Sequence, residues 1–122
     1  MALIHCHYHS DVLGLATSMD VILPQQTSRQ IGQDNVAAAG PCKVLYLLHG
    51  LSDDHTIWQR RTSIERYADR YGLMVVMPDG GRSFYTDMRS GGGNYAGHIL
   101  ESVRFIDRTF RTIASPAGRG IG

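Results

Sequence analysis

Two unbroken apolar segments with a helix-like stretch between them constrain the fold of this chain more than any other feature. Val44–Leu48 and Leu73–Pro78 each have the length of a single strand. Continuous rather than alternating apolarity is typical of parallel strands that are covered by helices on both faces. The stretch between them ends at Gly72, a natural helix stop, and predicts a helix. The three segments together predict a β-α-β unit in an α/β fold.

The predicted helix carries a start signal and an apolar face. Thr62 and Glu65 have the spacing of a capping box, in which two side chains satisfy the free N–H groups of a first turn. We therefore expect the helix to begin near Thr62. Its apolar stripe follows the spacing of a helix face, with Ile64, Tyr67, Ala68 and Tyr71.

Further strands and a second helix extend this unit on both sides. Leu3–His9 alternates as a strand does, and Ser18–Leu23 follows Gly14, so the two predict an antiparallel hairpin. Gln25–Gly40 predicts a polar surface connection. Asn94–Phe110 predicts a second helix. Its expected buried residues are Ile99, Val103, Ile106 and Phe110.

Two groups of side chains could be interpreted as metal ligands. His5, His7 and His9 share one face of the first strand, and an Asp-Asp-His triplet follows at 53–55. A half-exposed strand face and a solvated loop explain them more simply. On the strand, no nearby carboxylate or cysteine completes a ligand set. We expect no metal and no other cofactor.

Composition narrows the class of protein. The 122 residues suit one domain. A formal net charge of +1 gives no support for binding to nucleic acid or an anionic membrane, which normally needs a clustered basic surface. The start of the chain lacks a basic segment followed by an apolar one, so we expect no secretion signal. Cys6 and Cys42 make no disulfide framework, and we interpret them as reduced, buried thiols in a cytoplasmic protein.

The first apolar strand ends abruptly in His49-Gly50. Ligands of open α/β sheets bind beyond the carboxyl ends of the strands. A glycine at such a place allows a sharp turn and a close approach of the backbone. The N–H group after it could then point into the site. This arrangement suits an oxyanion hole, in which N–H groups stabilise the charge on a tetrahedral intermediate.

Two stretches resemble a known family. "LYLLHGLSDDHTIWQRRTSIERYADRYGLMVVMPDGGRSFYTD" closely resembles the putative-esterase branch of the α/β-hydrolases, which includes tributyrin esterases and S-formylglutathione hydrolase (esterase D). The opening, "MALIHCHYHSDVLGLATSMDVILP", is similar to the start of the tributyrin-esterase type. The resemblance covers most of residues 1–90. It implies an α/β-hydrolase fold and a serine carboxylesterase that hydrolyses short-chain acyl esters, including acylated carbohydrates.

The resemblance also implies roles for single residues. Leu51 matches the position whose backbone N–H forms half of the oxyanion hole, and Gly50 shapes that turn. Trp58 is expected either to wall the substrate pocket or to pack in the core. Tyr85 is expected to line the cleft or to be structural. His49 is interpreted as a residue that fixes the loop, because the base of this fold comes later in the chain.

The sequence departs from the family at the nucleophile. The motif G-x-S-x-G is absent, because neither Ser52 nor Ser83 is followed by the second glycine. The family places this motif after a strand resembling "AGRGIG", with which the chain ends. We therefore expect residues 1–122 to be the N-terminal part of a single α/β-hydrolase domain. The triad would lie in a C-terminal part, expected as a separate chain. A truncated gene product that folds poorly is another explanation for its absence, and a homo-oligomer is left open.

Two other classes of function are weighed against the esterase. A non-catalytic binding or interaction domain that keeps the fold is the main alternative. A nucleotide-binding module is less favoured, because "SGGGN" does not follow the first buried strand. The sequence also lacks G-x-G-x-x-G and G-x-x-x-x-G-K-[ST].

Overall fold

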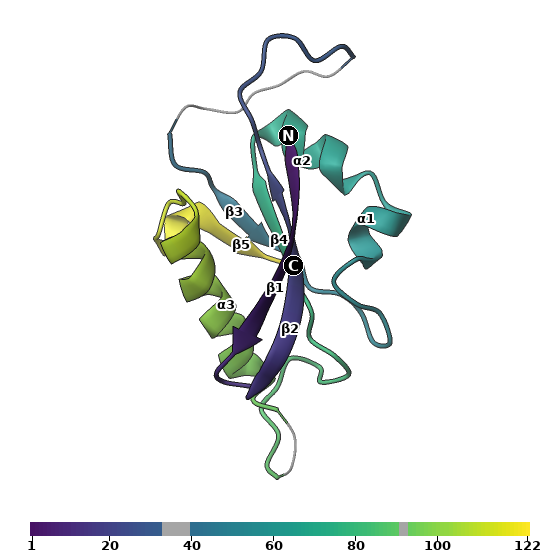
Figure 1. The fold of residues 1–122 in the computed structure, drawn as a ribbon, viewed down its shortest axis with the longest axis vertical. Helices are drawn as coiled ribbons and strands as arrows, with labels where there is room; N and C mark the ends of the chain where they lie inside the picture. Colours follow the sequence, from purple (N-terminus) through teal and green to yellow (C-terminus); the bar gives the residue numbers. More distant parts are fainter. Residues whose placement is uncertain (33–39, 91–92) are drawn as a thin grey trace.

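The fold is a five-stranded sheet between helices, seen in a computed structural model that describes residues 1–32, 40–90 and 93–122. The strand order is β1-β2-β4-β3-β5, with β3 parallel to both β4 and β5 and the other pairs antiparallel (Figure 1). The elements are β1 (Ala2–Ser10), β2 (Leu15–Leu23), β3 (Val44–Tyr46), α1 (Ile57–Arg61), α2 (Ile64–Tyr71), β4 (Met74–Pro78), α3 (Tyr95–Thr109), the 3-10 helix η1 (Pro116–Gly118) and β5 (Arg119–Ile121).

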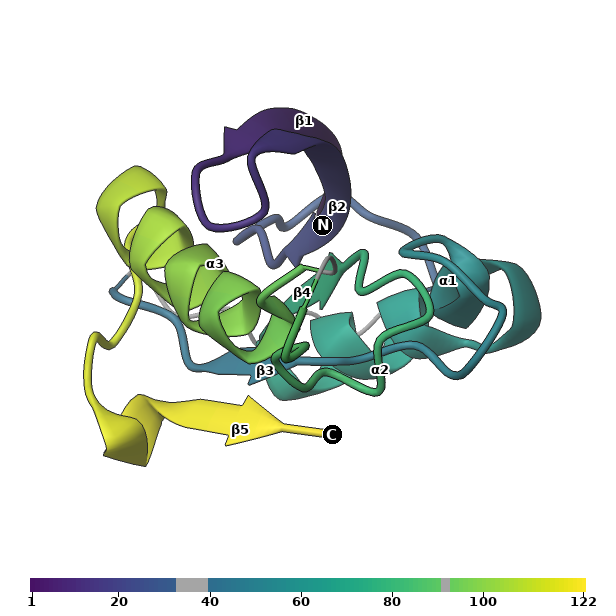
Figure 2. The same ribbon diagram turned by 90° about the horizontal axis from the view of Figure 1, so that it is seen from below.

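Helices cover both faces of the central strands, as the continuous apolarity predicts. Figure 2 shows α3 on one side of β3 and β4, and α1 and α2 on the other. Side chains alternate along each strand, so neighbours in sequence enter different cores. The cluster on the α3 side contains Met19, Val21, Val44, Tyr46, Met74, Val76 and Ile106. The cluster on the α1–α2 side contains Ile22, Ala68, Val75 and Met77.

The first expected strand of the β-α-β unit is shorter than predicted. β3 ends at Tyr46, although the apolar run continues to Leu48. Pairing nevertheless continues, because the Leu47 N–H donates to the Val76 carbonyl at 2.8 Å. The second strand, β4, is buried along its whole length, as predicted.

The capping box predicted for the central helix is wrong. Thr62 ends a short helix, α1, that the sequence did not predict, and its hydroxyl donates to the Trp58 carbonyl. Glu65 accepts a hydrogen bond from the Gln59 side chain at 2.8 Å instead of closing a box. The helix stop is confirmed, because Gly72 adopts φ 62° at the end of α2.

The apolar stripe of α2 is only partly buried. Ala68 is buried and Ile64 packs against the core, whereas Tyr67 and Tyr71 are 54% and 67% exposed. The face that the sequence assigned to the core therefore turns partly to solvent. The prediction for α3 holds better: Asn94 and Phe110 flank it, Ile99 and Ile106 are buried, and Val103 and Phe110 pack on the core.

The antiparallel hairpin is confirmed, with β2 beginning at Leu15. Its histidine face is exposed, and two of the histidines meet cross-strand partners: His5 Nδ1 donates to Asp20 at 2.7 Å, and His7 Nδ1 lies 2.7 Å from the Ser18 hydroxyl. Much of the expected connection Gln25–Gly40 lies outside the described residues.

The two cysteines are free thiols and half-buried rather than buried. Burial raises the pKa of both Cys6 and Cys42, so each is a protonated thiol at neutral pH. Within the described ranges, no helix is long and apolar enough to cross a membrane.

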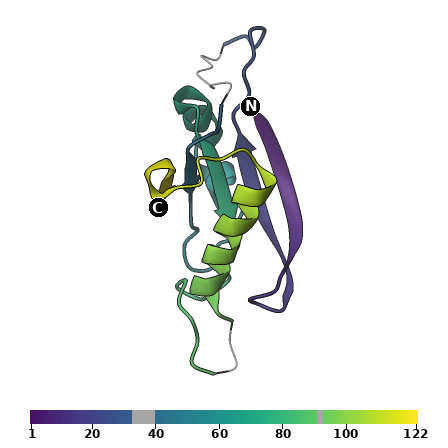
Figure 3. The ribbon, with the colours of Figure 1, turned by 90° about the vertical axis from the view of Figure 1, so that its left-hand side faces the viewer.

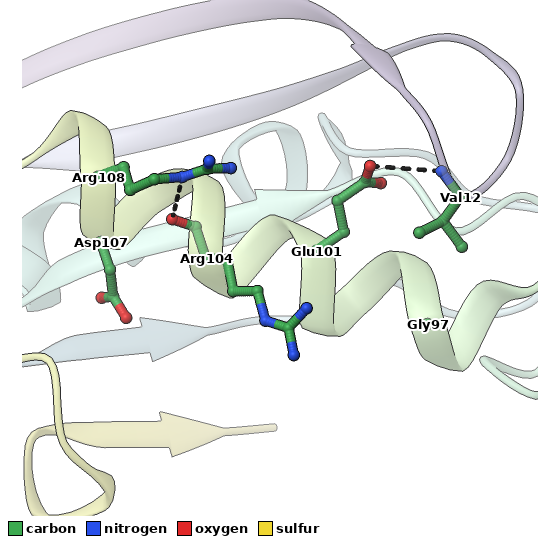
Figure 4. A pocket seen from close by; sticks show the side chains of 6 residues that line it. All are labelled: Val12, Gly97, Glu101, Arg104, Asp107 and Arg108. Atoms are coloured by element: carbon green, nitrogen blue, oxygen red, sulfur yellow. Dashed lines mark hydrogen bonds between the residues drawn. The ribbon is translucent and has the colours of Figure 1, made fainter.

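Glu101 of α3 holds the tip of the hairpin. Its carboxylate accepts hydrogen bonds from the Ser10 hydroxyl at 2.5 Å and from the backbone N–H groups of Asp11 and Val12 at 2.9 and 3.3 Å. Figure 3 shows the hairpin lying along α3, and Figure 4 shows the bond to Val12. Burial raises the pKa of Glu101, but these hydrogen bonds outweigh it and leave the pKa below 4.5.

We expect Glu101→Gln to lower the free energy of unfolding by about 1.5–3 kcal/mol at pH 7, the range for hydrogen bonds to charged groups. The folded state depresses this pKa, so the stabilisation is present above the ordinary value of 4.5 and disappears as the pH falls through the folded-state pKa. Urea unfolding of both proteins at several pH values measures it. A difference that persists unchanged at pH 2–3 would contradict the assignment.

Candidate functional site

The loops after β3 and β4 meet beyond one end of the sheet and enclose a small pocket. β3 and β4 are parallel, and β5 lies on the other side of β3, so the strand order reverses at β3. Open α/β sheets bind ligands at such a reversal. The two loops lie together in the lower part of Figure 1. The pocket has a volume of ≈190 Å³ and is lined by His49, Gly50, Leu51, Gly81, Phe84 and Tyr85.

His49 is a buried, neutral imidazole. Its Nε2 accepts a hydrogen bond from the Gly80 N–H at 2.9 Å, which requires Nε2 to be unprotonated. Nδ1 therefore carries the proton and donates to the Gly50 carbonyl at 2.8 Å. The Asp79 carboxylate lies 3.5 Å from Nε2, but an ion pair there would need the proton that the Gly80 bond excludes. Both nitrogens are occupied, so His49 fixes the loop, as the sequence predicts.

The His49 bond orients the peptide group that contains the candidate oxyanion donor. The Gly50 carbonyl and the Leu51 N–H belong to one trans peptide, in which they point in opposite directions. The carbonyl is held by His49 Nδ1 and by the Asp53 N–H at 3.2 Å. Among the described residues, no acceptor takes the Leu51 N–H. That N–H is a free donor on a fixed peptide, and Leu51 and Gly50 both line the pocket.

Backbone strain is concentrated around this pocket. In the described part of the chain, three non-glycine residues have φ between 50° and 70°: Ser52, Phe84 and Tyr85. Phe84 and Tyr85 line the pocket and Ser52 directly follows Leu51. A non-glycine residue in this region costs about 1–3 kcal/mol and persists where its surroundings force it, which is often at functional sites.

Tyr85 lies against the loop between β3 and α1, residues 47–56, which contains the candidate oxyanion donor. Its hydroxyl donates to the His49 carbonyl at 2.8 Å, and its ring meets the imidazole edge-on with centroids 5.8 Å apart. Burial raises the pKa of Tyr85 to about 12, so the hydroxyl stays protonated and remains a donor at neutral pH. The ring covers Gly80 so closely that a Cβ there would lie 2.2 Å from it.

Trp58 lies in α1 and is not among the residues that line the pocket. The indole packs against the α1–α2 core and donates to the Leu48 carbonyl at 3.0 Å. This placement favours the core-packing alternative, and contact with substrate stays a prediction for Trp58. Tyr85, in contrast, lines the pocket and also holds the His49 carbonyl. Contact with substrate stays a prediction for Tyr85 as well.

The side chains of the Asp-Asp-His triplet at 53–55 do not form one cluster, because Asp54 and His55 bind different partners. Asp54 accepts from the Thr56 N–H at 2.9 Å, and His55 Nδ1 donates to Asp79 at 3.2 Å. The hydrogen bonds from Thr56 lower the pKa of Asp54. In the parts of the chain that the structure describes, no group of three or more His, Cys, Asp or Glu side chains could hold a metal ion.

The surroundings of Ser52 and Ser83 are not those of a nucleophilic serine. Ser83 is buried; its hydroxyl donates to the Gly80 carbonyl at 2.6 Å and accepts from the Tyr85 N–H at 3.1 Å. Ser52 is exposed on the turn after Leu51. Neither residue follows a strand and opens a helix, which a nucleophile elbow requires.

A second, larger pocket lies elsewhere on the molecule. It has a volume of ≈520 Å³ and runs along α3 beside the hairpin tip (Figure 4). Its lining is mainly charged and consists of Val12, Gly97, Glu101, Arg104, Asp107 and Arg108. The candidate oxyanion donor, the Leu51 N–H, is not among these residues; Leu51 lines the smaller pocket instead.

Sequence reasoning missed the contribution of the loop after β4. The Gly80 N–H donates to His49, and Gly81 and Phe84 line the pocket, but only Tyr85 of this segment was predicted. The available signal was the pair Gly80-Gly81, which follows a buried strand after a single residue, Asp79. It repeats the pattern of Gly50, which follows the neighbouring strand β3.

The family model described as "Putative esterase" matches residues 10–103. An acetyl esterase of Caldicellulosiruptor saccharolyticus is 32% identical over 87 residues, which are 71% of this chain and 32% of that protein. The fold is that of the α/β-hydrolases. The chain belongs to the putative esterase family within that superfamily.

Solved structures agree with this assignment. Staphylococcus aureus FphF, a fluorophosphonate-binding serine hydrolase, superposes with a TM-score of 0.85 at 37% identity, over 98% of this chain and 46% of that one. The S. aureus S-formylglutathione hydrolase FrmB has a TM-score of 0.80, also at 37% identity and with the same coverage. This chain therefore spans about half the length of the solved relatives that it matches and a third of the acetyl esterase.

Proposed function

We propose that this chain is part of a serine carboxylesterase that hydrolyses short-chain acyl esters, and that it supplies half of the oxyanion hole. The observation that carries the proposal is the Leu51 N–H. It has no acceptor among the described residues and belongs to a peptide whose carbonyl is held by two donors. A donor that is fixed before the reaction costs no reorganisation when the oxyanion forms.

The nucleophile of the proposed reaction comes from outside these 122 residues, because they contain no G-x-S-x-G motif. In the mechanism, a serine attacks the ester carbonyl, whose oxygen becomes an oxyanion. The Leu51 N–H donates to that oxygen, together with the N–H of the residue after the nucleophile. The carboxylate and histidine of the triad are likewise supplied by the C-terminal part. An additional strand of that part can pair with β5, which is an edge strand among the described residues.

The part of the pocket that this chain supplies is small. Its volume of ≈190 Å³ is below the roughly 300–1,000 Å³ of sites that enclose a drug-sized ligand. Phe84 and Tyr85 give it apolar walls. Acylated carbohydrates fit this proposal because the sugar could stay outside the pocket. One relative is named an acetyl esterase.

The direct test joins this chain at Gly122 to the part of FrmB that it does not match. We expect the fusion enzyme to hydrolyse p-nitrophenyl acetate and a serine-directed fluorophosphonate to block it. Residues 1–122 alone should be inactive. Esters of two to eight acyl carbons measure the chain-length preference, which should fall beyond short chains.

A non-catalytic binding domain is the alternative outcome. It would be supported by a folded fusion enzyme that neither hydrolyses these esters nor reacts with the fluorophosphonate. Inhibitor-sensitive turnover by residues 1–122 alone would contradict the assignment of the nucleophile to the C-terminal part.

A further inference from the structure

We propose that Tyr85 is a positioning residue for the oxyanion donor: its hydroxyl locks the His49 carbonyl and thereby sets the direction of the Leu51 N–H. The inference rests on the proposed esterase function. It assigns Tyr85 a part in turnover that differs from lining the pocket.

The loop after β4 forms hydrogen bonds with two separate atoms of His49. The Gly80 N–H donates to the imidazole Nε2 at 2.9 Å, and the Tyr85 hydroxyl donates to the main-chain carbonyl at 2.8 Å. One bond fixes the ring and the other fixes the backbone of the same residue. His49 Nδ1 then holds the Gly50 carbonyl at 2.8 Å. Two hydrogen bonds, joined through the covalent frame of His49, thus connect Tyr85 to the peptide that carries the Leu51 N–H.

The position of Tyr85 is itself determined from several directions. Its N–H donates to the Ser83 hydroxyl at 3.1 Å, and the same hydroxyl donates to the Gly80 carbonyl at 2.6 Å. Both Phe84 and Tyr85 adopt positive φ, so the loop is held in a conformation that these residues rarely adopt. The absent side chain at Gly80 leaves the space that the tyrosine ring fills.

The test compares Tyr85→Phe with Tyr8→Phe in the fusion enzyme. Tyr8 is a matched control: it is also a partly buried tyrosine whose hydroxyl meets one partner, the Ser102 hydroxyl at 3.1 Å, and its pKa is likewise raised to about 12. Tyr8 lies outside the lining of the oxyanion pocket. Both substitutions keep the ring and remove one hydroxyl, so both should lower stability by similar amounts.

We expect Tyr85→Phe to lower kcat about tenfold with KM within about twofold, because one neutral hydrogen bond contributes up to about a factor of ten. Loss confined to kcat indicates an interaction that acts in the transition state. Tyr8→Phe should leave kcat within about twofold. A Tyr85→Phe enzyme with unchanged kcat, or a Tyr8→Phe enzyme with an equal loss, would overturn the proposal.

A second measurement does not depend on turnover. The fusion enzyme labelled with ¹⁵N reports the order parameter of the Leu51 amide, which should fall in Tyr85→Phe and stay unchanged in Tyr8→Phe. If the fusion enzyme without substitutions were inactive, the proposed esterase function would be wrong. The amide measurement would still show whether Tyr85 orders Leu51. An unchanged Leu51 amide in a folded Tyr85→Phe protein would overturn the inference.

Discussion

Replacing the Leu51 amide by an ester in the fusion enzyme should lower kcat about 10²–10³-fold, the range measured when one oxyanion donor is removed. The replacement deletes the N–H and changes the shape of the backbone little. Semisynthesis or incorporation of the α-hydroxy analogue of leucine provides the protein, and p-nitrophenyl acetate turnover provides the rate. Leu51→Ala should keep much of the activity, because the side chain is 52% exposed and the backbone supplies the donor.

A matched control separates loss of the donor from loosening of the turn. An ester at Asp53 deletes the N–H that donates to the Gly50 carbonyl at 3.2 Å, but it leaves the Leu51 N–H in place. We expect a much smaller loss of kcat for this variant. Equal losses for the two esters would mean that rigidity of the turn matters and that the oxyanion donor lies elsewhere. Full activity of the Leu51 ester would lead to the same conclusion.

The fold could be predicted from sequence wherever burial leaves a periodic signal. Val44–Leu48 and Leu73–Pro78 are apolar on both faces, and this alone predicts central parallel strands with helices on either side. The prediction fails where residues on an apolar helix face are not buried. Tyr67 and Tyr71 fit the helical period of α2 yet are largely exposed, since an amphipathic residue can stay at the surface. The five residues of α1 are too few to show a period.

The candidate site could be predicted only where its signal is local. His49, Gly50 and Leu51 are consecutive and follow a buried strand, so their place at the carboxyl end of the sheet was predictable. The contact between Tyr85 and His49 spans 36 residues and depends on how two loops pack. The positive φ of Phe84 and Tyr85 has no sequence signal, because neither residue favours that region.

His49 donates one hydrogen bond through Nδ1 and accepts another through Nε2. Two substitutions should separate these two roles. The side-chain amide of Asn lies near the position of Nδ1 and can donate to the Gly50 carbonyl, but it cannot reach Gly80. The longer Gln side chain can accept from the Gly80 N–H near the position of Nε2, but its amide group no longer faces the Gly50 carbonyl. We therefore expect crossed effects of His49→Asn and His49→Gln on stability and turnover.

His49→Asn should be the less stable variant, because it leaves the Gly80 N–H buried without an acceptor, at a cost of about 1–3 kcal/mol. His49→Gln should be the slower enzyme, with kcat at least tenfold lower and the loss of a whole oxyanion donor, about 10²–10³-fold, as its limit. Urea unfolding and p-nitrophenyl acetate kinetics of the fusion enzyme measure the two effects. If the less stable variant were also the slower one, His49 would act on turnover only through the stability of the loop. The tautomer that the Gly80 bond implies would then have no separate role in aiming the Leu51 N–H.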